Sequence, residues 1–260
     1  ANVCNEAALY AARKGREQVI HQDFLDAVDR IIGGLEKRTK IISNEEKRTI
    51  AFHEAGHAVV SWLVEFASPL VKVSIVPRGQ SLGAAWYLPE ERQITTTEQM
   101  LDEMCAALGG RAAEDLVFNK ISTGALSDLE KVTKQAYAMV SIYGLNERIG
   151  NRSYYDSRGD QMFTKPYSEE TSRIIDEEVG KIIDSAYDRA KQILQSNFDK
   201  LSTVADSLLT NEVIFREDVE RILGARPFTK AEDALSSPQA DIGSESTEQA
   251  QKDATESEKE

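Results

Sequence analysis

Long apolar segments, cysteine pairs and a nucleotide-binding loop are all missing from this chain of 260 residues. No apolar run approaches the ~18 residues that a membrane-spanning helix needs. The two cysteines, Cys4 and Cys105, lie far apart and outside any C-x-x-C pair, which argues against a dithiol redox motif or a zinc finger and favours a reducing compartment. No Gly-x-x-x-x-Gly-Lys-Ser/Thr motif occurs, so we do not expect the chain to bind ATP by itself.

Basic residues are outnumbered, with 31 Lys and Arg against 44 Asp and Glu and a net charge of −13. The excess is uneven, because residues 231–260 hold nine acids and only two lysines. This segment has almost no large apolar side chains, so it cannot bury enough surface to offset the entropy of ordering. We predict a disordered acidic tail at 228–260. The lack of a basic stripe argues against nucleic acid as a partner.

Residues 1–34 have the pattern of two short helices. Helix formers fill residues 5–13, and a second run with apolar residues at helical spacing stops at Gly33-Gly34. Two helices this small are marginal alone, and the chain starts without Met. We therefore expect residues 1–34 to be the end of a preceding domain, residues 35–43 to be a linker, and the chain to be a fragment of a longer protein.

What the chain does have is a His-Glu-x-x-His pattern, which uses two of its only three histidines. His53 and His57 lie in an apolar run, so on a helix both rings point to one side, one turn apart. Two neutral imidazoles in this arrangement can bind one zinc ion. Glu54 can take a proton from a water at the same metal, where the water's pKa falls to roughly 7. The pattern predicts two ligands and a general base for amide hydrolysis.

A catalytic zinc needs a third protein ligand, and the spacing leaves its identity open. The longer pattern His-Glu-x-x-His-x-x-Gly-x-x-His is excluded, because Val60 and Leu63 stand at the Gly and third His positions. The remaining histidine, His21, lies in what we expect to be a different domain. The third ligand is then a carboxylate, and seven qualify by pattern alone: Glu65, Glu90, Glu91, Glu114, Asp115, Asp128 and Glu130.

The pattern after the linker predicts a mainly α fold with a small β-sheet. Ser43 and Glu46 fit a capping box at the start of the histidine helix, which we expect to reach about Phe66. Alternating residues predict strands at 71–76 and 82–88. Their exposed edge near a metal could bind an extended peptide, but a simple hairpin covering the helix fits the sequence equally well.

Further helices are expected in the second half of the chain. They are predicted at 96–118, from a turn at 122–128 to Gly144, at 168–196, at 201–209 and at 217–223, with a long loop at 145–167. Gly109-Gly110 interrupts the first of these patterns. Paired glycines in a helix cost about 1 kcal/mol each relative to Ala, so we expect them to allow close packing against another backbone.

Several segments, in this order, resemble the C-terminal part of the FtsH-type family, the membrane-anchored ATP-dependent zinc proteases of bacteria, mitochondria and plastids. The resemblance spans roughly residues 2–226. It rests on residues 5–13, which are similar to the end of an AAA+ lid; on His53 to Ala58; on Pro77-Arg78-Gly79 with Leu82-Gly83; on Leu88-Pro89-Glu90-Glu91; on Gly109 to Glu114; and on Ser122-Thr123-Gly124-Ala125 with Asp128-Leu129. This combination is far more specific than the zinc motif alone.

The resemblance implies roles for individual residues. By position, His53, His57 and Asp128 match the family's zinc ligands. Glu54 matches its base. Ser127 departs from the family, which usually has Asn before the ligand Asp.

The resemblance also implies domains, partners and a location. Residues 1–34 would be the end of an AAA+ helical lid, and residues 44–227 a mainly helical peptidase domain with one zinc per subunit. The family forms hexameric rings whose ATPase feeds in unfolded membrane and soluble proteins. ATP would act only through an upstream ATPase core, and a missing N-terminal segment would anchor the protein. The peptidase would face the cytoplasm in a bacterium, or lie at an organelle inner membrane in a eukaryote.

Two other interpretations remain at this point. A subunit of the same fold could serve assembly or chaperoning without chemistry, although such a subunit would be free to lose the motif. The zinc could instead be structural, which requires a fourth His or Cys ligand nearby. Cys105 is the one candidate that the sequence offers.

Overall fold

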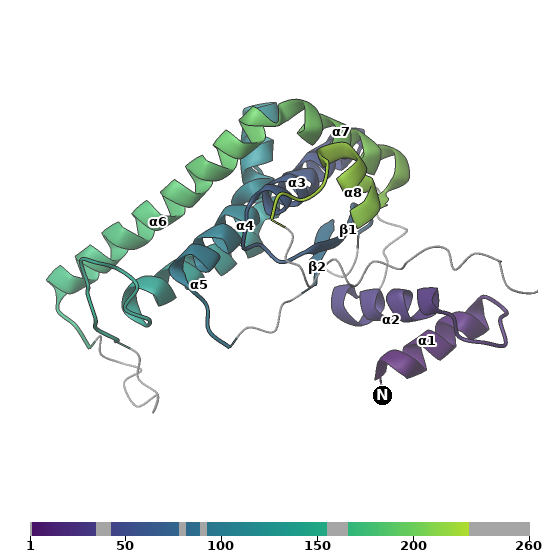
Figure 1. Ribbon diagram of the computed structural model, residues 1–260, viewed down its shortest axis with the longest axis horizontal. Coiled ribbons are helices and arrows are strands. Elements are labelled where there is room, and N and C mark those ends of the chain that lie inside the picture. Colours follow the sequence, from purple (N-terminus) through teal and green to yellow (C-terminus); the bar gives the residue numbers. More distant parts are fainter. Residues whose placement is uncertain (1, 35–42, 78–81, 89–92, 155–165, 229–260) are drawn as a thin grey trace, which may run out of the picture. The chain divides into compact units, whose positions relative to one another are not determined.

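The computed structural model describes residues 2–34, 43–77, 82–88, 93–154 and 166–228. These residues are mainly helical with one small sheet (Figure 1), which confirms the expected fold class. In chain order the elements are α1 (Asn2–Arg13), α2 (His21–Gly33), α3 (Asn44–Leu63), β1 (Leu70–Ser74), β2 (Ala84–Tyr87), α4 (Thr97–Phe118), a 3-10 turn η1 (Thr123–Ala125), α5 (Leu126–Ser141), α6 (Glu169–Ser196), α7 (Phe198–Asn211), β3 (Val213–Phe215) and α8 (Arg216–Leu223). Five predicted features lie partly or wholly outside the described residues: the linker at 35–43, the motif Pro77-Arg78-Gly79, the carboxylates Glu90 and Glu91, the loop at 145–167 and the tail at 228–260.

Helix α3 begins where the sequence predicts. The Ser43 hydroxyl accepts a hydrogen bond from the N–H of Glu46 (3.2 Å), and the Ser43 N–H donates to the Glu46 carboxylate (3.0 Å). This closed capping box satisfies two backbone donors at the helix start. From Ile50 to Trp62 every residue is buried. A helix that is covered on all sides forms the centre of a core rather than one of its faces.

The end of α3 differs from the prediction, because the helix stops at Leu63 and not at Phe66. Val64 already has extended backbone (φ −102°, ψ 150°). Two residues later the N–H of Phe66 donates to the buried carboxylate of Asp102 on α4 (2.9 Å), which also accepts from Arg189 on α6 (2.5 Å). The Asp102 carboxylate therefore connects α4, α6 and the segment after α3. Such a long-range contact cannot be predicted from a local sequence pattern.

Helices α3 and α4 touch at their glycines. A methyl group on Gly56 would lie 2.3 Å from the carbonyl oxygen of Gly109, and one on Gly109 would lie 2.6 Å from that of Gly56. The two backbones are therefore in direct contact, as expected from the paired glycines. The predicted interruption at Gly109-Gly110 is wrong, since α4 runs unbroken from Thr97 to Phe118. Tertiary packing overrides the low helix propensity of glycine here.

The sheet is antiparallel, with strand order β2-β1-β3. Strand β1 pairs with β2 from Leu70 opposite Tyr87 to Ser74 opposite Ala84, which confirms the two predicted strands with shorter bounds. Strand β3 was not expected. It has only three residues between two helices and pairs with β1, and three residues are too few for alternation to be read from the sequence.

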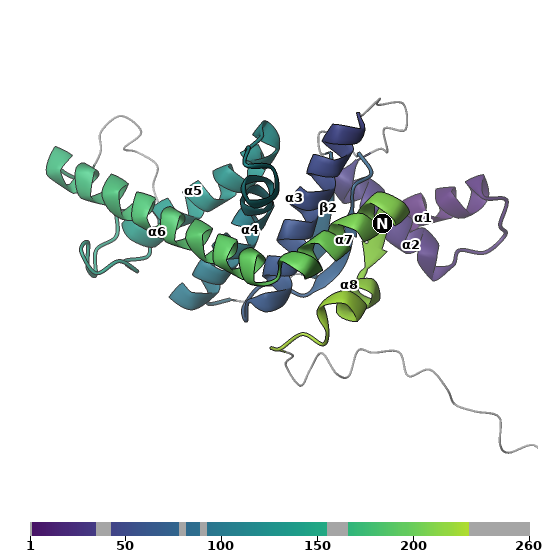
Figure 2. The same cartoon turned by 90° about the horizontal axis from the view of Figure 1, so that it is seen from above.

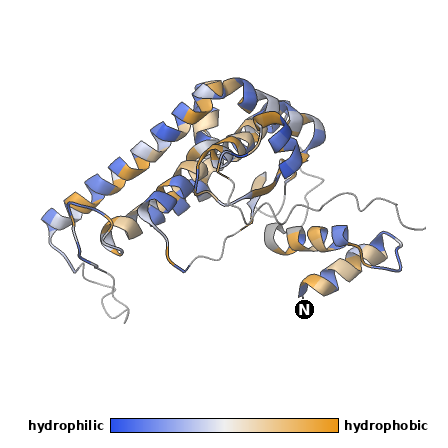
Figure 3. Ribbon diagram, in the orientation of Figure 1, coloured by the Kyte–Doolittle hydropathy of each residue, from blue (hydrophilic) through white to orange (hydrophobic). Residues whose placement is uncertain are grey.

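Two apolar clusters form the core of the region from α3 to α8. One contains α3, the sheet, α7 and α8, and the other contains α5 and the first half of α6; α4 and α6 contribute to both. Helix α6 runs 28 residues across α4 and α5 (Figure 2). Hydrophilic and hydrophobic residues alternate along it (Figure 3), as expected for a long helix with one face on the core.

Helices α1 and α2 pack against each other through small residues, with Ala7, Ala11 and Ala27 at most 3% exposed. At the start of α2 the buried Asp23 accepts a hydrogen bond from the N–H of Ile20 (3.1 Å) and pairs with Arg16. Of the helices in the described ranges, none combines the length and the apolar character that a bilayer crossing requires.

Candidate metal centre

Helix α3 brings the two histidines of the motif together. His53 and His57 are each 8% exposed, and their Nε2 atoms lie 3.1 Å apart. Both rings are therefore withdrawn from solvent with one nitrogen of each aimed at the same point.

The second nitrogen of each ring has a fixed partner. The Nδ1 of His53 lies 2.6 Å from the carboxylate of Glu114, and the Nδ1 of His57 lies 2.9 Å from the carbonyl oxygen of Ala106. Because both partners can only accept, each Nδ1 carries a proton, and Nε2 is the atom of each ring that can bind a metal. Glu114 in turn accepts from the N–H of Ser122 (2.7 Å). Histidines that bind metals are generally oriented by such partners.

Asp128 reaches the same point from the first turn of α5. Its Oδ2 lies 3.4 Å from Nε2 of His53 and 3.5 Å from Nε2 of His57. Ligand atoms at ~2.0–2.1 Å from a tetrahedral zinc lie ~3.3 Å from one another. The separations of 3.1, 3.4 and 3.5 Å fit such an ion. Within the described part of the chain these three residues form the one group with metal-ligand spacing.

Gly110 on α4 keeps the space in front of the rings clear. A methyl group there would lie 2.5 Å from Nε2 of His53 and 2.6 Å from Nε2 of His57. Any larger residue would occupy the place that a shared ion needs. Two imidazoles, one carboxylate and a cleared space form a donor set that suits zinc with an open coordination position.

The electrostatics of the site favour a positive charge between the three groups. Burial lowers the pKa of His53, but hydrogen bonds to Asp128 and Glu114 outweigh it and raise the pKa to about 10. Burial raises the pKa of Asp128, and the two histidines oppose this and hold that pKa well below its usual range. A divalent cation can take the place of the proton, since metal binding displaces protons from its ligands.

Glu54 lies beside this group in a different environment. It is 6% exposed and lines the same cavity as the two rings and Asp128. Burial raises its pKa above the usual value, the two histidines partly offset this, and the Asp128 charge adds to the rise. A buried carboxylate with a raised pKa is a better proton acceptor near neutral pH than an ordinary one.

The comparison with known protein families gives this arrangement a context. A profile described as "Peptidase family M41" matches residues 40–222, which is well over half of the chain and includes all four site residues. The chain belongs to peptidase family M41. The M41 match runs from just before α3 to α8, so the metallopeptidase domain is the part of the chain built around the two apolar clusters.

Named relatives of this M41 chain are proteases, and two of the three described here are named as zinc metalloproteases. The "ATP-dependent zinc metalloprotease FtsH" of Parabacteroides distasonis is 60% identical over 255 residues, 98% of this chain and 37% of that protein. The protein of the same name from Rhodothermus marinus is 56% identical over 232 residues, 88% of this chain and 33% of that protein. The "Mitochondrial inner membrane m-AAA protease component AFG3L2" of Mus musculus is 49% identical over 231 residues, which are 88% of this chain and 29% of that protein. The resemblance to the FtsH-type family is confirmed, and the chain spans about a third of these relatives' length.

The structure separates the carboxylates that the sequence left as equals. Glu65 is exposed just beyond α3, Asp115 pairs with a lysine and a tyrosine of α6, and Glu130 is exposed and pairs with a lysine one turn on. Glu114 lies behind His53 on its Nδ1 and not on the side of the shared point. Of the candidates in the described residues, Asp128 alone meets both Nε2 atoms.

Two cavities flank the M41 centre. One, of about 400 Å³, is lined by residues that include Asp128 and alanines of β2 and α4. The other, of about 820 Å³, has apolar walls from Ile50, Leu82 and Leu126. His53, Glu54 and Gly83 line both cavities, so the metal centre has an open cavity on each side.

Sequence reasoning missed the groups that support the site. The carbonyl of Ala106, the role of Glu114 behind His53 and the contacts of Gly83 and Gly110 all depend on which helix faces α3. The pair Gly109-Gly110 is a usable signal in the sequence, but by itself it indicates only close packing and not a cleared metal site. Cys105 is buried in the core and is not in the metal-ligand group of the described residues, so the structure offers no closed four-ligand site there.

Proposed function

We propose that this chain is the peptidase part of an ATP-dependent zinc endopeptidase of the FtsH type. The observation that carries the proposal is the meeting of His53, His57 and Asp128 at tetrahedral separations, beside a buried carboxylate, within an M41 domain. The names of its relatives support zinc as the metal. We propose one zinc per chain, held by Nε2 of each histidine and by Oδ2 of Asp128.

The chain's own residues would divide the chemistry as follows. A bound zinc supplies a Lewis acid that polarises the scissile carbonyl and lowers the pKa of an adjacent water to roughly 7. Glu54 accepts the proton of that water at its carboxylate and then donates it to the leaving amine. Glu114 and the carbonyl of Ala106 keep both imidazoles in the tautomer that presents Nε2.

We propose that the substrate lies extended along β2. In the sheet order of the described strands β2 is at an edge, and its residues Ala84 and Ala85 line the smaller cavity at the centre. An extended peptide can add to such an edge through main-chain hydrogen bonds, which suits an enzyme that accepts unfolded proteins of varied sequence. The cavities on either side would receive the side chains next to the scissile bond.

The remaining proposals concern the longer protein. Residues 1–34 would end an AAA+ lid, 35–43 would link it to the peptidase domain at 44–227, and 228–260 would form an acidic tail. We propose a homo-hexamer that takes in unfolded membrane and soluble proteins, with ATP acting only through an upstream ATPase core. We also propose anchoring in a membrane, with the peptidase on the cytoplasmic side in a bacterium or at an organelle inner membrane in a eukaryote. The names of the relatives support ATP dependence and a membrane location, while nothing in the comparisons favours an inactive assembly subunit.

The decisive test is Glu54→Gln in the full-length protein. We expect zinc content to stay at one per chain while cleavage of unfolded casein falls by at least 10²-fold. The reason is that the neutral amide of glutamine cannot accept the proton of the attacking water. Glu65→Gln, an exposed carboxylate just beyond the same helix, is the matched control and should cleave at the wild-type rate. Casein cleavage at the wild-type rate by Glu54→Gln would show that Glu54 is not the base.

A further inference from the structure

The carboxylate of Glu54 is held differently from the groups around it. Charges act on it from both histidines and from Asp128, but no N–H or O–H of the described residues donates a hydrogen bond to it. Its position therefore depends on packing. Gly83 lies against this carboxylate, since a methyl group added to Gly83 would lie 2.6 Å from Oε1 and 2.8 Å from Cγ of Glu54.

Turn geometry does not explain the glycine at this position. The described glycines with left-handed backbone are Gly15, Gly34, Gly144, Gly150 and Gly224, and Gly83 is not among them. Alanine could therefore adopt its backbone conformation without strain. Gly83 is nevertheless buried, and the space that its missing side chain leaves is filled by the end of Glu54.

We infer that Gly83 is a positioning residue for the general base, an inference that rests on the proposed role of Glu54. The backbone of residue 83 acts as a stop that sets how far the carboxylate can swing from the metal centre. A methyl group there would meet the flexible end of a side chain rather than backbone, so Glu54 would move and the fold would remain. A shift of about 1 Å in a catalytic group can cost up to 10²-fold in rate.

The position of Gly83 in the chain adds a link to the substrate. The residue directly precedes β2, whose Ala84 is paired with Ser74 of β1 in the sheet. Strand β2, which would bind the peptide, therefore follows directly on Gly83, which limits the movement of Glu54. Gly83 would hold Glu54 at a fixed place relative to the scissile bond.

The test is Gly83→Ala in the zinc-loaded full-length protein, with a fluorogenic peptide as substrate. We expect kcat to fall between 10- and 100-fold, KM to change less than 2-fold, and zinc content and melting temperature to match the wild type. Gly180→Ala on α6, where an added methyl group meets nothing within 4 Å, is the control and should leave kcat, KM and zinc content unchanged, with a melting temperature equal to or slightly above that of the wild type.

A double-mutant cycle with Glu54→Ala separates positioning from other effects. Alanine lacks Cγ, Cδ and both carboxylate oxygens, so none of the Glu54 atoms that the methyl group added by Gly83→Ala would meet remains in that background. We expect Gly83→Ala to change kcat less than 2-fold in that background. The inference is overturned if Gly83→Ala keeps wild-type kcat, if its effect is the same in both backgrounds, or if it removes zinc or the fold. An active Glu54→Gln would instead overturn the proposed function itself.

Discussion

At the scale of single residues, the M41 site depends on three groups that belong to distant parts of the chain. His53 and His57 are adjacent by helix geometry, but Asp128 joins them only through the packing of α5. Its side chain is about 25% exposed, so it approaches from the open side of the centre, whereas Glu114 is 2% exposed and approaches from behind. The two carboxylates are chemically alike, but they approach His53 from opposite sides.

This difference leads to a prediction for Asp128→Ala. We expect zinc content to fall well below one per chain, because two imidazoles alone leave the ion without its only anionic ligand. Elemental analysis after dialysis measures it. Glu130→Ala, an exposed carboxylate on the same helix, should keep full zinc. Full occupancy in Asp128→Ala would transfer the ligand role to another carboxylate such as Glu114.

The same residues show what the sequence could and could not predict. The spacing of His53 and His57 predicted their common face, because that depends on local helix geometry alone. The choice of Asp128 among seven carboxylates came from family resemblance, since no local pattern contains the packing of α5 on α4. Gly83 belongs to a motif that carries the family resemblance, but its contact with Glu54 depends on how the hairpin covers α3.

At the scale of elements, the four glycines at the contacts of α3 with α4 and with the hairpin form two groups by what they touch. Gly56 and Gly109 meet backbone of the opposite helix, whereas Gly83 and Gly110 meet the ends of functional side chains. Backbone cannot move aside as a side chain can. The first pair therefore sets the distance between α3 and α4, and the second pair leaves room for chemistry.

We accordingly predict that Gly109→Ala destabilises the zinc-loaded protein. An added methyl group 2.6 Å from the Gly56 carbonyl forces the helices apart, and overpacking of this kind costs about 1–3 kcal/mol, only partly offset by the higher helix propensity of Ala. Urea denaturation measures the free energy of unfolding of each variant. Gly180→Ala meets no neighbour and should be neutral or stabilising by up to about 1 kcal/mol. Equal stability of the two variants would contradict this account of the α3–α4 contact.

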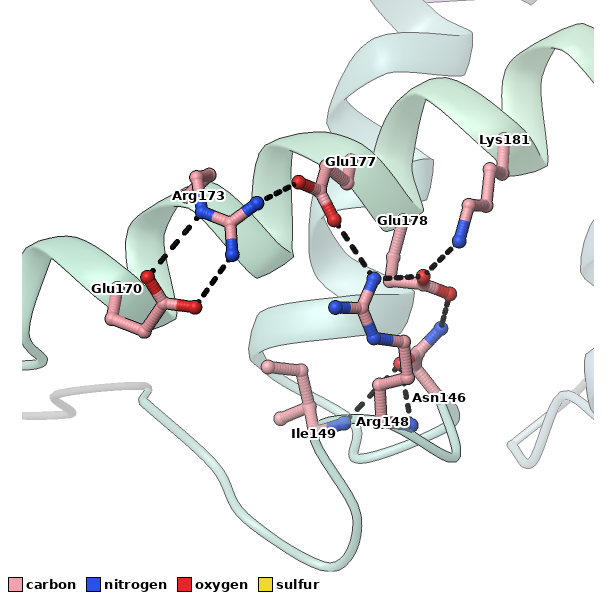
Figure 4. Close-up of polar contacts among 8 residues, drawn as sticks. All are labelled: Asn146, Arg148, Ile149, Glu170, Arg173, Glu177, Glu178 and Lys181. Atoms are coloured by element: carbon pink, nitrogen blue, oxygen red, sulfur yellow. Dashed lines mark hydrogen bonds and ion pairs between the residues drawn. The ribbon is translucent and has the colours of Figure 1, made fainter.

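The turn after α5 is held to α6 by charge (Figure 4). Glu178 accepts from Lys181 (2.7 Å), from Asn146 (2.9 Å) and from Arg148 (2.9 Å). The hydrogen bonds from these three residues lower the pKa of Glu178 to about 2. A carboxylate with a depressed folded-state pKa stabilises the fold above its unfolded pKa, and this contribution is lost as pH falls toward the folded value.

We therefore predict a pH-dependent effect of Glu178→Gln. The variant should melt below the wild type at pH 7, and the difference should shrink as pH falls from about 4.5 to about 2. Calorimetry of both proteins at several pH values measures it. Glu170→Gln, which removes a more exposed pair with Arg173, should have a smaller effect. A difference in melting temperature that is the same at pH 7 and pH 3 would contradict the role of the Glu178 charge.

At the scale of the whole molecule, the metal centre lies where the two apolar clusters meet. The histidines are on α3, the centre of the first cluster, and Asp128 begins α5, whose buried face belongs to the second. The pairing of strand β3 with β1 and the hydrogen bonds of Asp102 are long-range contacts that the sequence did not predict. A shared ion would add one more, directly across the boundary between the clusters.

We predict that zinc stabilises both sides of this boundary. A ligand that binds only the folded state at 1,000 times its Kd adds about 4 kcal/mol, so chelation should lower the melting temperature and zinc should restore it. Hydrogen exchange with and without zinc locates the effect. Because the ion is held from two elements, protection should rise both near residues 53–57 and near residues 122–132. In Asp128→Ala, zinc should no longer protect the second segment. Protection confined to α3 in the wild type would mean that the ion is held by the histidines alone, and that the two clusters are joined by packing without it.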